Sequence, residues 1–389
     1  MNIDFTDFKE KNDLPNKAVR VVVAMSGGVD SSVAAALMVK AGFEVIGVTM
    51  KLYDDKRKKA TSKTCCTGVD ISDAQEVAKS LRIKHYVLDY QDTFRKEVIN
   101  DFINSYENGS TPIPCIKCNQ TVKFTDLIQF TKSVNSEILV TGHYVKRLNI
   151  DGDTILYQAN DLDKDQSYFL FSTTKDQLKF LRFPLGHYKK TEIRKFAKYF
   201  KLNNSEKADS QDICFIPNGD YKDFLKNKLK KSQSNSGPII NSFDQVIGKH
   251  DGIYRYTIGQ RKGIGVGGIK GNNKHEPLYV LEIDKKTNTI KVGSKKDLEK
   301  YKIYLNNIHL IGDIDKDQLN VDIKLRSSQK KMNAKINLSK KSSNAIVELN
   351  HPAYGVSPGQ ACVFYKKNKL LGGGWIVAAE KNANKTLAE

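Results

Sequence analysis

Three cysteines have the reactivity and spacing for sulfur or metal chemistry. Cys115 and Cys118 form a Cys-x-x-Cys pair, and Cys214 lies farther along in a Cys-Phe-Ile sequence. Such a pair can be half a zinc site, a redox couple or a group for catalytic sulfur transfer. Structural zinc is the least favoured, because the sequence has no second pair and no closely spaced histidines. Pro112 and Pro114 predict a stiff loop at the pair, which disfavours thioredoxin-like redox use.

A second candidate site is the glycine loop, residues 26–32, with the sequence Ser-Gly-Gly-Val-Asp-Ser-Ser. It follows an unbroken apolar run, residues 21–25, and begins a helical pattern that extends to Val39. Adjacent glycines let the backbone turn tightly and bring its N–H groups close to an anion. At a helix N-terminus the helix dipole also favours negative charge. The loop lacks the lysine of a Walker loop, so it predicts a different kind of phosphate site.

Strands and helices that alternate between Val19 and about Val145 must position these groups. This alternation predicts an α/β fold, with a parallel sheet built from βαβ units. Ligands of such sheets bind at the carboxyl ends of the strands, where the glycine loop, Met50, Gly142 and His143 would meet. The expected strands are residues 21–25, 44–52, 85–89 and 138–143. The expected helices are residues 70–81, 94–106, 124–132 and 192–201.

The pattern of the sequence changes after about Pro217. Residues 218–289 contain glycine-rich, basic runs, among them Arg261 and Lys262. From about Ile290 onward, short alternating strands recur between Gly, Pro and Asn turns, which predicts a small β-barrel or sandwich. We therefore expect an N-terminal α/β domain at residues 1–217, a central domain at 218–289 and a C-terminal β-barrel at 290–389.

Composition and charge argue against some classes of protein and favour others. The 389-residue chain is 39% hydrophobic and has no apolar run of membrane length, so we expect a cytoplasmic protein without a membrane partner. Residues 1–16 resemble neither a signal peptide nor a transit sequence, and we expect them to be a frayed extension. Six cysteines are too few for a disulfide scaffold. The net charge of +19 favours a polyanionic partner such as nucleic acid, although a lysine-rich composition alone would also produce it.

The order and spacing of these motifs resemble the tRNA-specific 2-thiouridylase family. The glycine loop resembles the SGGxDS loop of the wider ATP-pyrophosphatase (PP-loop) superfamily. The resemblance covers nearly the whole chain after Val19. The segments that carry it are residues 26–32, 65–66, 111–119, 141–144, 164–168, 209–216, 259–263 and 357–360.

This resemblance implies an enzyme, a tRNA-uridine 2-sulfurtransferase. ATP, with Mg²⁺, would adenylate C2 of the wobble uridine at position 34 of tRNA, and a cysteine persulfide would then give 2-thiouridine with release of AMP and pyrophosphate. Adenylation makes the C2 oxygen a good leaving group and so splits one difficult step into easier ones. The resemblance assigns the nucleophile to Cys118 and the persulfide intermediate to Cys214. These two would end as a disulfide that a reductant opens, and a persulfide donor protein is an expected partner.

The resemblance also implies binding residues. The ATP-binding residues would be Ala24, Met25, Ser26, Gly27, Gly28, Val29, Asp30, Ser31, Met50 and Gly142. The tRNA-binding residues would be His143 and the exposed residues Lys164, Asp165, Gln166, Arg326, Ser327 and Gln360.

One departure from the family opens an alternative mechanism. Cys115 stands where many members have Asp, a candidate acid or base, and a thiol is a poorer match to that role. Cys115, Cys118 and Cys214 could instead hold a [4Fe–4S] cluster with one iron open to sulfide. More distant alternatives are a PP-loop amide or amidine ligase that does not use Cys118, and a basic RNA-binding protein with a decayed loop. We favour the persulfide route, and the intact glycine loop argues against decay.

Overall fold

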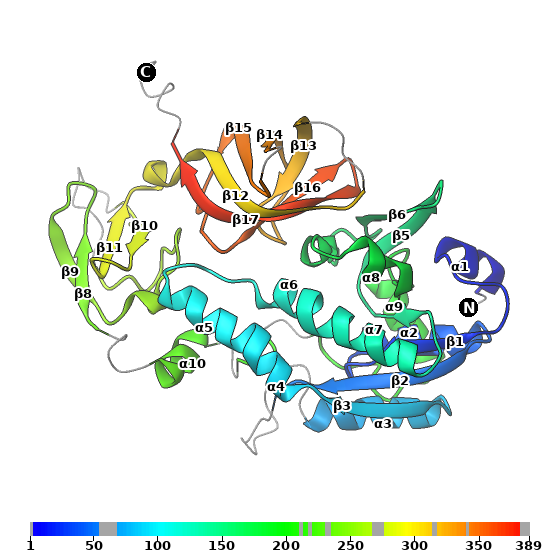
Figure 1. The fold of residues 1–389 in the computed structure, drawn as a ribbon. Coiled ribbons are helices and arrows are strands. Elements are labelled where there is room, and N and C mark those ends of the chain that lie inside the picture. Colours follow the sequence, from blue (N-terminus) through cyan, green and yellow to red (C-terminus); the bar gives the residue numbers. More distant parts are fainter. Residues whose placement is uncertain are drawn as a thin grey trace.

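The computed structural model describes residues 3–53, 68–209, 213–216, 220–229, 235–266, 276–312, 317–339 and 342–381. Cys65 and Cys66 lie outside these ranges, as do residues 210–212 of the Cys214 motif. The described residues form three sheets (Figure 1). An N-terminal parallel sheet, a small central sheet and a C-terminal barrel confirm the predicted α/β fold class.

The N-terminal sheet has the strand order β3-β2-β1-β4-β7, and all its pairings are parallel. Alternate side chains of β1 enter two different cores, Val22 in one and Val21 and Val23 in the other, because helices cover both faces. The strands are β1 (Arg20–Ala24), β2 (Glu44–Lys51), β3 (Lys84–Asp89), β4 (Leu139–Val140) and β7 (Leu181–Arg182). The helices include α2 (Val29–Lys40), α3 (Gly68–Ser80), α4 (Gln91–Phe94), α5 (Asn100–Glu107), α7 (Phe124–Ser133), α8 (Lys175–Phe180) and α9 (Lys190–Tyr199).

The Cys-x-x-Cys pair lies on a helix, α6 (Pro114–Cys118), so the loop predicted there is wrong. Pro114 is the first residue of this helix, where a missing N–H breaks no hydrogen bond and the fixed φ of proline fits. The helix continues through a π-helical turn, η2 (Asn119–Lys123), into α7. A second π-helical turn, η1 (Arg95–Ile99), joins α4 to α5.

The N-terminal segment is ordered against the sheet, so the expectation of a frayed extension is also wrong. Helix α1 (Phe5–Lys11) buries Phe8, which is 1% exposed. Asp13 follows it and forms ion pairs with Arg147 and Arg182, two arginines whose side chains are almost fully buried. Apolar contact and charge pairing together hold the segment in place.

The C-terminal sheet closes into a barrel of six strands, because β12 pairs with both β15 and β17. A hairpin from the N-terminal half, β5 (Val145–Ile150) and β6 (Asp153–Gln158), extends the same sheet beside β17. The sequence patterns did not lead us to predict this hairpin. The barrel strands are β12 (Lys300–Leu310), β13 (Gln318–Lys324), β14 (Met332–Leu338), β15 (Ala345–Ala353), β16 (Ala361–Lys366) and β17 (Lys369–Glu380).

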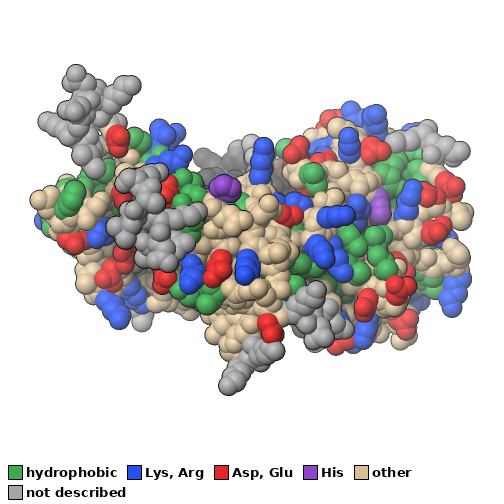
Figure 2. Space-filling model, turned by 90° about the horizontal axis from the view of Figure 1, so that it is seen from above, with side chains coloured by type: hydrophobic (Ala, Val, Ile, Leu, Met, Phe, Trp, Pro, Cys, Tyr) green, Lys and Arg blue, Asp and Glu red, His purple; other side chains and the backbone are tan. Residues whose placement is uncertain are grey.

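In the sequence, the central sheet comes between these two parts; its strand order is β10-β11-β8-β9, and helix α10 (Tyr221–Lys228) precedes it. Its strands are β8 (Gly237–Ile240), β9 (Val246–His250), β10 (Tyr279–Asp284) and β11 (Thr289–Gly293). Figure 2 shows Lys and Arg side chains distributed over the upper face of the molecule, with Asp and Glu between them. None of the helices in the described ranges combines the length and apolar character needed to cross a membrane.

Candidate active site

The glycine loop lies where the order of the parallel sheet reverses. β1 pairs with β2 on one side and with β4 on the other, and a ligand crevice is expected beyond the carboxyl ends at such a point. Gly142, which follows β4, packs against the loop. A Cβ built on Gly142 would lie 2.9 Å from the backbone nitrogen of Ser31. The structure thus brings together the loops after β1 and β4, as the sequence predicted.

Internal hydrogen bonds fix the shape of the glycine loop. The Ser26 N–H donates to the Ser31 hydroxyl (3.1 Å), which in turn donates to the Gly28 carbonyl (3.1 Å). Gly27 has a φ of +71°, and a Cβ there would lie 2.1 Å from the Asp70 carbonyl oxygen, so only glycine fits. Gly28 is the N-cap of α2 and has no side chain to cap the first N–H groups of the helix. Such groups at a helix N-terminus favour a phosphate ligand.

Asp30 in the first turn of α2 belongs to a partly buried ionic network. The Lys190 ammonium donates to both Asp30 oxygens, at 2.7 and 2.8 Å, and the Tyr144 hydroxyl donates to one of them at 2.7 Å. Lys190 also pairs with Asp209 at 2.8 Å. Lys164 and Arg194 bind the same Asp209 carboxylate, at 2.9 and 2.8 Å. Three cations therefore share two carboxylates beside the glycine loop.

The pKa of Asp209 reflects this network. Burial alone would raise it, but hydrogen bonds from Lys190 and Lys164 outweigh burial, and the pKa of the Asp209 carboxyl falls to about 2. The hydrogen bond to Asp209 correspondingly raises the pKa of Lys164. The Asp209 carboxylate and the Lys164 ammonium are therefore both charged at neutral pH.

The two cysteines of α6 have different surroundings. Cys118 is 5% exposed and belongs to the same core cluster as Met50, while Cys115 is exposed. Burial raises the pKa of the Cys118 thiol to about 11, and the charge of Lys123 partly opposes this rise. Cys214 is half-buried against the same cluster, next to the buried Phe215. The core that holds Cys118 therefore also borders Cys214.

His143 lies between two aromatic rings rather than on an open surface. It contacts the edges of Phe124 and Phe183, and its Nδ1 lies 2.8 Å from the Thr141 hydroxyl. Burial, with a smaller contribution from Lys123, lowers the pKa of His143 to about 3. The imidazole is therefore neutral at physiological pH.

The segment 164–168 connects the α/β domain to the barrel. Asp165 is 8% exposed and accepts hydrogen bonds from Gln158, Ala159 and Ser167, so the expectation that its side chain is exposed is wrong. The Gln166 side chain accepts from the Tyr144 N–H at 2.9 Å. The contacts with tRNA expected for this segment stay predictions.

Tyr168 connects this segment directly to the barrel. Its hydroxyl donates to the carbonyls of Leu325 and Ala361 in the barrel, at 3.2 and 3.0 Å. The Ser167 hydroxyl lies 3.1 Å from that of Tyr365. The motif thus holds two domains together.

The predicted barrel residues lie at two domain contacts. Gln360 donates to the Thr111 carbonyl at 2.9 Å, just before α6. The exposed Arg326 donates to the Gly355 carbonyl at 2.8 Å, where Gly355 meets Gly259 of the central domain. Ser327 is half-buried beside it. The structure places these residues apart from the glycine loop.

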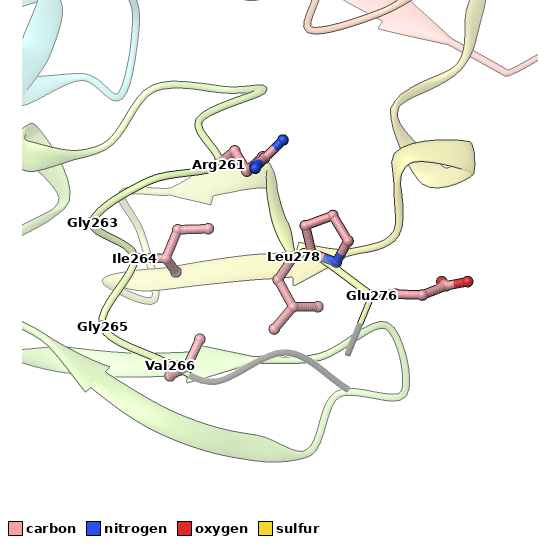
Figure 3. A pocket seen from close by; sticks show the side chains of 8 residues that line it. Arg261, Gly263, Ile264, Gly265, Val266, Glu276 and Leu278 are labelled. Atoms are coloured by element: carbon pink, nitrogen blue, oxygen red, sulfur yellow. The ribbon is translucent and has the colours of Figure 1, made fainter. Parts of the chain in front are cut away.

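The central domain has a pocket of about 300 Å³ beside Arg261 (Figure 3). Ile264, Val266 and Leu278 converge in it, whereas Glu276 points away from them. Arg261 and Lys262 are exposed on a turn stabilised by the Gln260 side chain, which donates to the Lys262 carbonyl at 3.0 Å. This turn places two positive charges on the surface of the central domain.

The described residues do not fit a resident metal. No three His, Cys, Asp or Glu side chains among them are grouped as a metal ion would require. Cys115 is exposed while Cys118 faces the core, so the alternative of a [4Fe–4S] cluster on Cys115, Cys118 and Cys214 does not fit this arrangement. Both oxygens of Asp30 are bound by Lys190, which leaves no free carboxylate in the glycine loop for Mg²⁺.

The sequence reading missed Lys190, Arg194, Asn204 and Lys207. Lys190 and Arg194 are four residues apart on α9, so they lie on one helix face, and this spacing was the available signal. Asn204 and Lys207 belong to an irregular segment, and only the fold brings them to the loop.

A parallel sheet with a glycine loop at its switch point, joined to a closed β-barrel, defines an α/β nucleotide-binding protein of the PP-loop class. Three family models match consecutive parts of the chain: the tRNA methyl transferase HUP domain (residues 19–218), the tRNA methyl transferase PRC-barrel domain (222–294) and the aminomethyltransferase beta-barrel domain (300–376).

Curated relatives give the particular family. The chain is 47% identical over 367 residues to tRNA-specific 2-thiouridylase MnmA of Wolbachia sp. subsp. Drosophila simulans, covering 94% of this chain and 96% of that one. It is 45% identical over 363 residues to the enzyme of the same name from Rhodospirillum centenum, covering 93% and 92%. The chain belongs to the tRNA-specific 2-thiouridylase family.

Two solved structures are more distantly similar. One is a 4-thiouridine synthetase in complex with RNA and bound ATP, with a TM-score of 0.35, 17% identity and coverage of 54% of this chain and 50% of that one. The other is NMN synthetase from Francisella tularensis, with a TM-score of 0.33, 17% identity and coverage of 60% and 84%.

Proposed function

We propose that this protein is a tRNA-uridine 2-sulfurtransferase that converts the wobble uridine of tRNA to 2-thiouridine at the expense of ATP. The observation that carries the proposal is the near full-length identity of 47% to relatives named for this reaction. The reaction needs a phosphate site and two thiols, and a glycine loop at a helix N-terminus together with two thiols that border one core support the proposal. The proposed domains are residues 1–217 for the chemistry, with 218–289 and 290–389 for tRNA.

The first step is adenylation at the glycine loop. The C2 oxygen of uridine attacks the α-phosphate of ATP, forming an O–P bond as the bond to the β-phosphate breaks and pyrophosphate leaves. The backbone N–H groups of residues 27–31 would bind the phosphates, with the N-terminus of α2 stabilising their charge. Ala24, Met25, Met50 and Gly142 would line the rest of the nucleotide site.

The second step transfers sulfur. The terminal sulfur of a persulfide on Cys214 attacks C2, forming a C–S bond, and AMP leaves. The Cys118 thiolate then attacks the Cys214 sulfur and breaks the S–S bond. This releases 2-thiouridine and leaves a Cys118–Cys214 disulfide, which takes two electrons from a reductant. A persulfide donor protein reloads Cys214, in a cytoplasm that keeps thiols reduced.

Recognition of tRNA would use the basic surface of the central domain and the barrel. Arg261 and Lys262 on their exposed turn, and Arg326 and Gln360 at the domain contacts, would contact phosphates. The other proposed contacts are His143, Lys164, Asp165, Gln166 and Ser327. Because the Asp165 carboxylate is buried, this residue would position the segment rather than bind tRNA through its side chain.

The test is mass spectrometry of tRNA nucleosides after incubation with Mg–ATP and a persulfide donor. Cys118→Ser and Cys214→Ser should abolish 2-thiouridine but keep ATP–pyrophosphate exchange, because adenylation needs neither thiol. Cys115→Ser is the matched control on the same helix and should keep substantial thiolation. Thiolation by Cys118→Ser at the wild-type rate would overturn the assignment. Loss of activity together with bound iron in Cys115→Ser would favour the cluster mechanism instead.

A further inference from the structure

Lys190, the first residue of α9, is an ammonium group shared between two separate segments. It binds Asp30 of the glycine loop and Asp209, which lies five positions before Cys214 in the sequence. Its side chain is only 12% exposed, and it lies over the Tyr144 ring at 5.8 Å from the ring centre. Because water screens such a partly buried group weakly, any change of charge at the loop acts on this cation.

Asp209 ends an irregular segment, residues 204–209, which we call the strap. The strap also contacts the glycine loop near its own start. The Asn204 side chain donates to the Gly27 carbonyl at 3.0 Å and to the Ser32 hydroxyl at 2.9 Å. Lys207 donates to the same Gly27 carbonyl at 3.2 Å. The strap is therefore bound to the loop directly near its start and through Lys190 at its end.

In the sequence, Cys214 follows the strap and precedes two closely packed residues, Phe215 and Ile216. Phe215 packs edge-on against Phe94 and Phe102, with ring centres 5.7 and 5.3 Å apart, and Ile216 is 1% exposed. In the sequence, the half-buried Cys214 therefore stands between Asp209, which is held by its ion pairs, and the packed residues Phe215 and Ile216. Of these two constraints, only the ionic one involves the glycine loop.

We propose that Lys190 is a positioning residue that couples nucleotide occupancy of the glycine loop to the exposure of Cys214. The proposal rests on the ATP and persulfide roles proposed above. A polyphosphate adds several negative charges at the N-terminus of α2, and these compete with Asp209 for the Lys190 ammonium. Asp209 keeps Lys164 and Arg194 but loses its bond to the loop side, so the strap shifts and the Cys214 thiol becomes more accessible. Sulfur would then be delivered only when ATP is in place.

The experiment measures alkylation of Cys214 in the full chain by peptide mass spectrometry, with and without α,β-methylene-ATP, which cannot be cleaved between its α- and β-phosphates. In the wild type the nucleotide should speed alkylation about fivefold or more, the lower end of ordinary coupling between two sites. Lys190→Met should bring this ratio close to one, while Lys190→Arg should restore most of it. Asp209→Asn removes the ion pair between Asp209 and Lys190 but keeps the pair between Asp30 and Lys190. This variant should therefore also lose the response to nucleotide.

Lys198→Met is the matched control. It removes another ion pair between α9 and the strap, Lys198 to Glu206 at 2.9 Å, which is exposed and does not touch the loop. This variant should respond to nucleotide as the wild type does. Equilibrium dialysis of the same nucleotide distinguishes failure of the proposed function from failure of the coupling. A wild type that binds no nucleotide overturns the proposed function and this inference together. A full response in Lys190→Met or in Asp209→Asn overturns the coupling alone.

Discussion

Gly27→Ala should damage the glycine loop far more than the same change at a glycine with similar backbone angles. Gly27 (φ +71°) and Gly42 (φ +86°) both adopt the left-handed conformation. They differ in their surroundings, because a Cβ on Gly27 would lie 2.1 Å from the Asp70 carbonyl oxygen, whereas one on Gly42 would meet nothing within 4 Å. Gly42→Ala therefore reports the backbone strain alone.

The magnitudes follow from these contacts. Left-handed strain in a non-glycine residue costs about 1–2 kcal/mol, so Gly42→Ala should lower the free energy of unfolding by about that amount. Gly27→Ala adds an overlap with backbone at the start of α3, and relief of such overpacking costs about 1–3 kcal/mol more. Gly28 has a negative φ, and its Cβ would lie 3.4 Å from the Ser26 hydroxyl oxygen, which is ordinary contact. Gly28→Ala should therefore change stability little.

The assay combines urea unfolding with equilibrium dialysis of ATP. Only Gly27→Ala should lose nucleotide affinity along with stability, because the loop must move away from Asp70 to admit the new methyl group. Equal losses of unfolding free energy in Gly27→Ala and Gly42→Ala, with ATP affinity retained in both, would refute the packing argument.

Three further predictions test other parts of the structure. Asp13→Asn leaves the buried charges of Arg147 and Arg182 without their carboxylate and should destabilise the protein by about 3 kcal/mol in urea unfolding; Asp7→Asn, which breaks the exposed pair with Lys11, should cost at most about 1 kcal/mol. Tyr168→Phe removes the donor shared by the Leu325 and Ala361 carbonyls and should cost about 1–3 kcal/mol, and an unchanged urea midpoint would contradict that contact. Alkylation of Cys118 should follow its raised pKa of about 11 in the folded protein and the ordinary thiol value, about 8.5, in urea. Since the folded-state pKa is the higher one, the stability that the neutral thiol contributes should be complete below about pH 8.5 and be lost as the pH rises toward 11.

The sequence was sufficient for features with a local signal. The apolar run before the glycine loop predicted β1, and Gly27-Gly28 predicted the turn, because few other arrangements use such residues. Helix α6 was missed because proline was taken as a breaker, although Pro114 occupies the one helical position that tolerates it. The β5–β6 hairpin had a readable signal in Asp151-Gly152, whose positive φ values suit a tight hairpin turn.

Other features depend on tertiary contacts and had no readable signal. Asp165 looks exposed in a polar segment, yet four donor groups from the chain around it surround its carboxylate. Asp30 and Asp209 are far apart in the sequence, and nothing local indicates that they share Lys190 as an ion-pair partner. Charge networks of this kind are set by how elements pack, so they appear only once the fold is known.

The barrel also contacts the segment that leads into helix α6. Its turn at residues 357–360 holds the chain just before α6: the Thr111 N–H donates to the Pro358 carbonyl at 2.8 Å, and the Thr111 and Ser357 hydroxyls lie 2.9 Å apart. Gly359 approaches Thr111 so closely that a Cβ would lie 3.1 Å from its carbonyl oxygen. The start of the helix that carries Cys118 is therefore fixed by the C-terminal domain. Any displacement of this turn would therefore move the attachment of the helix that carries Cys118.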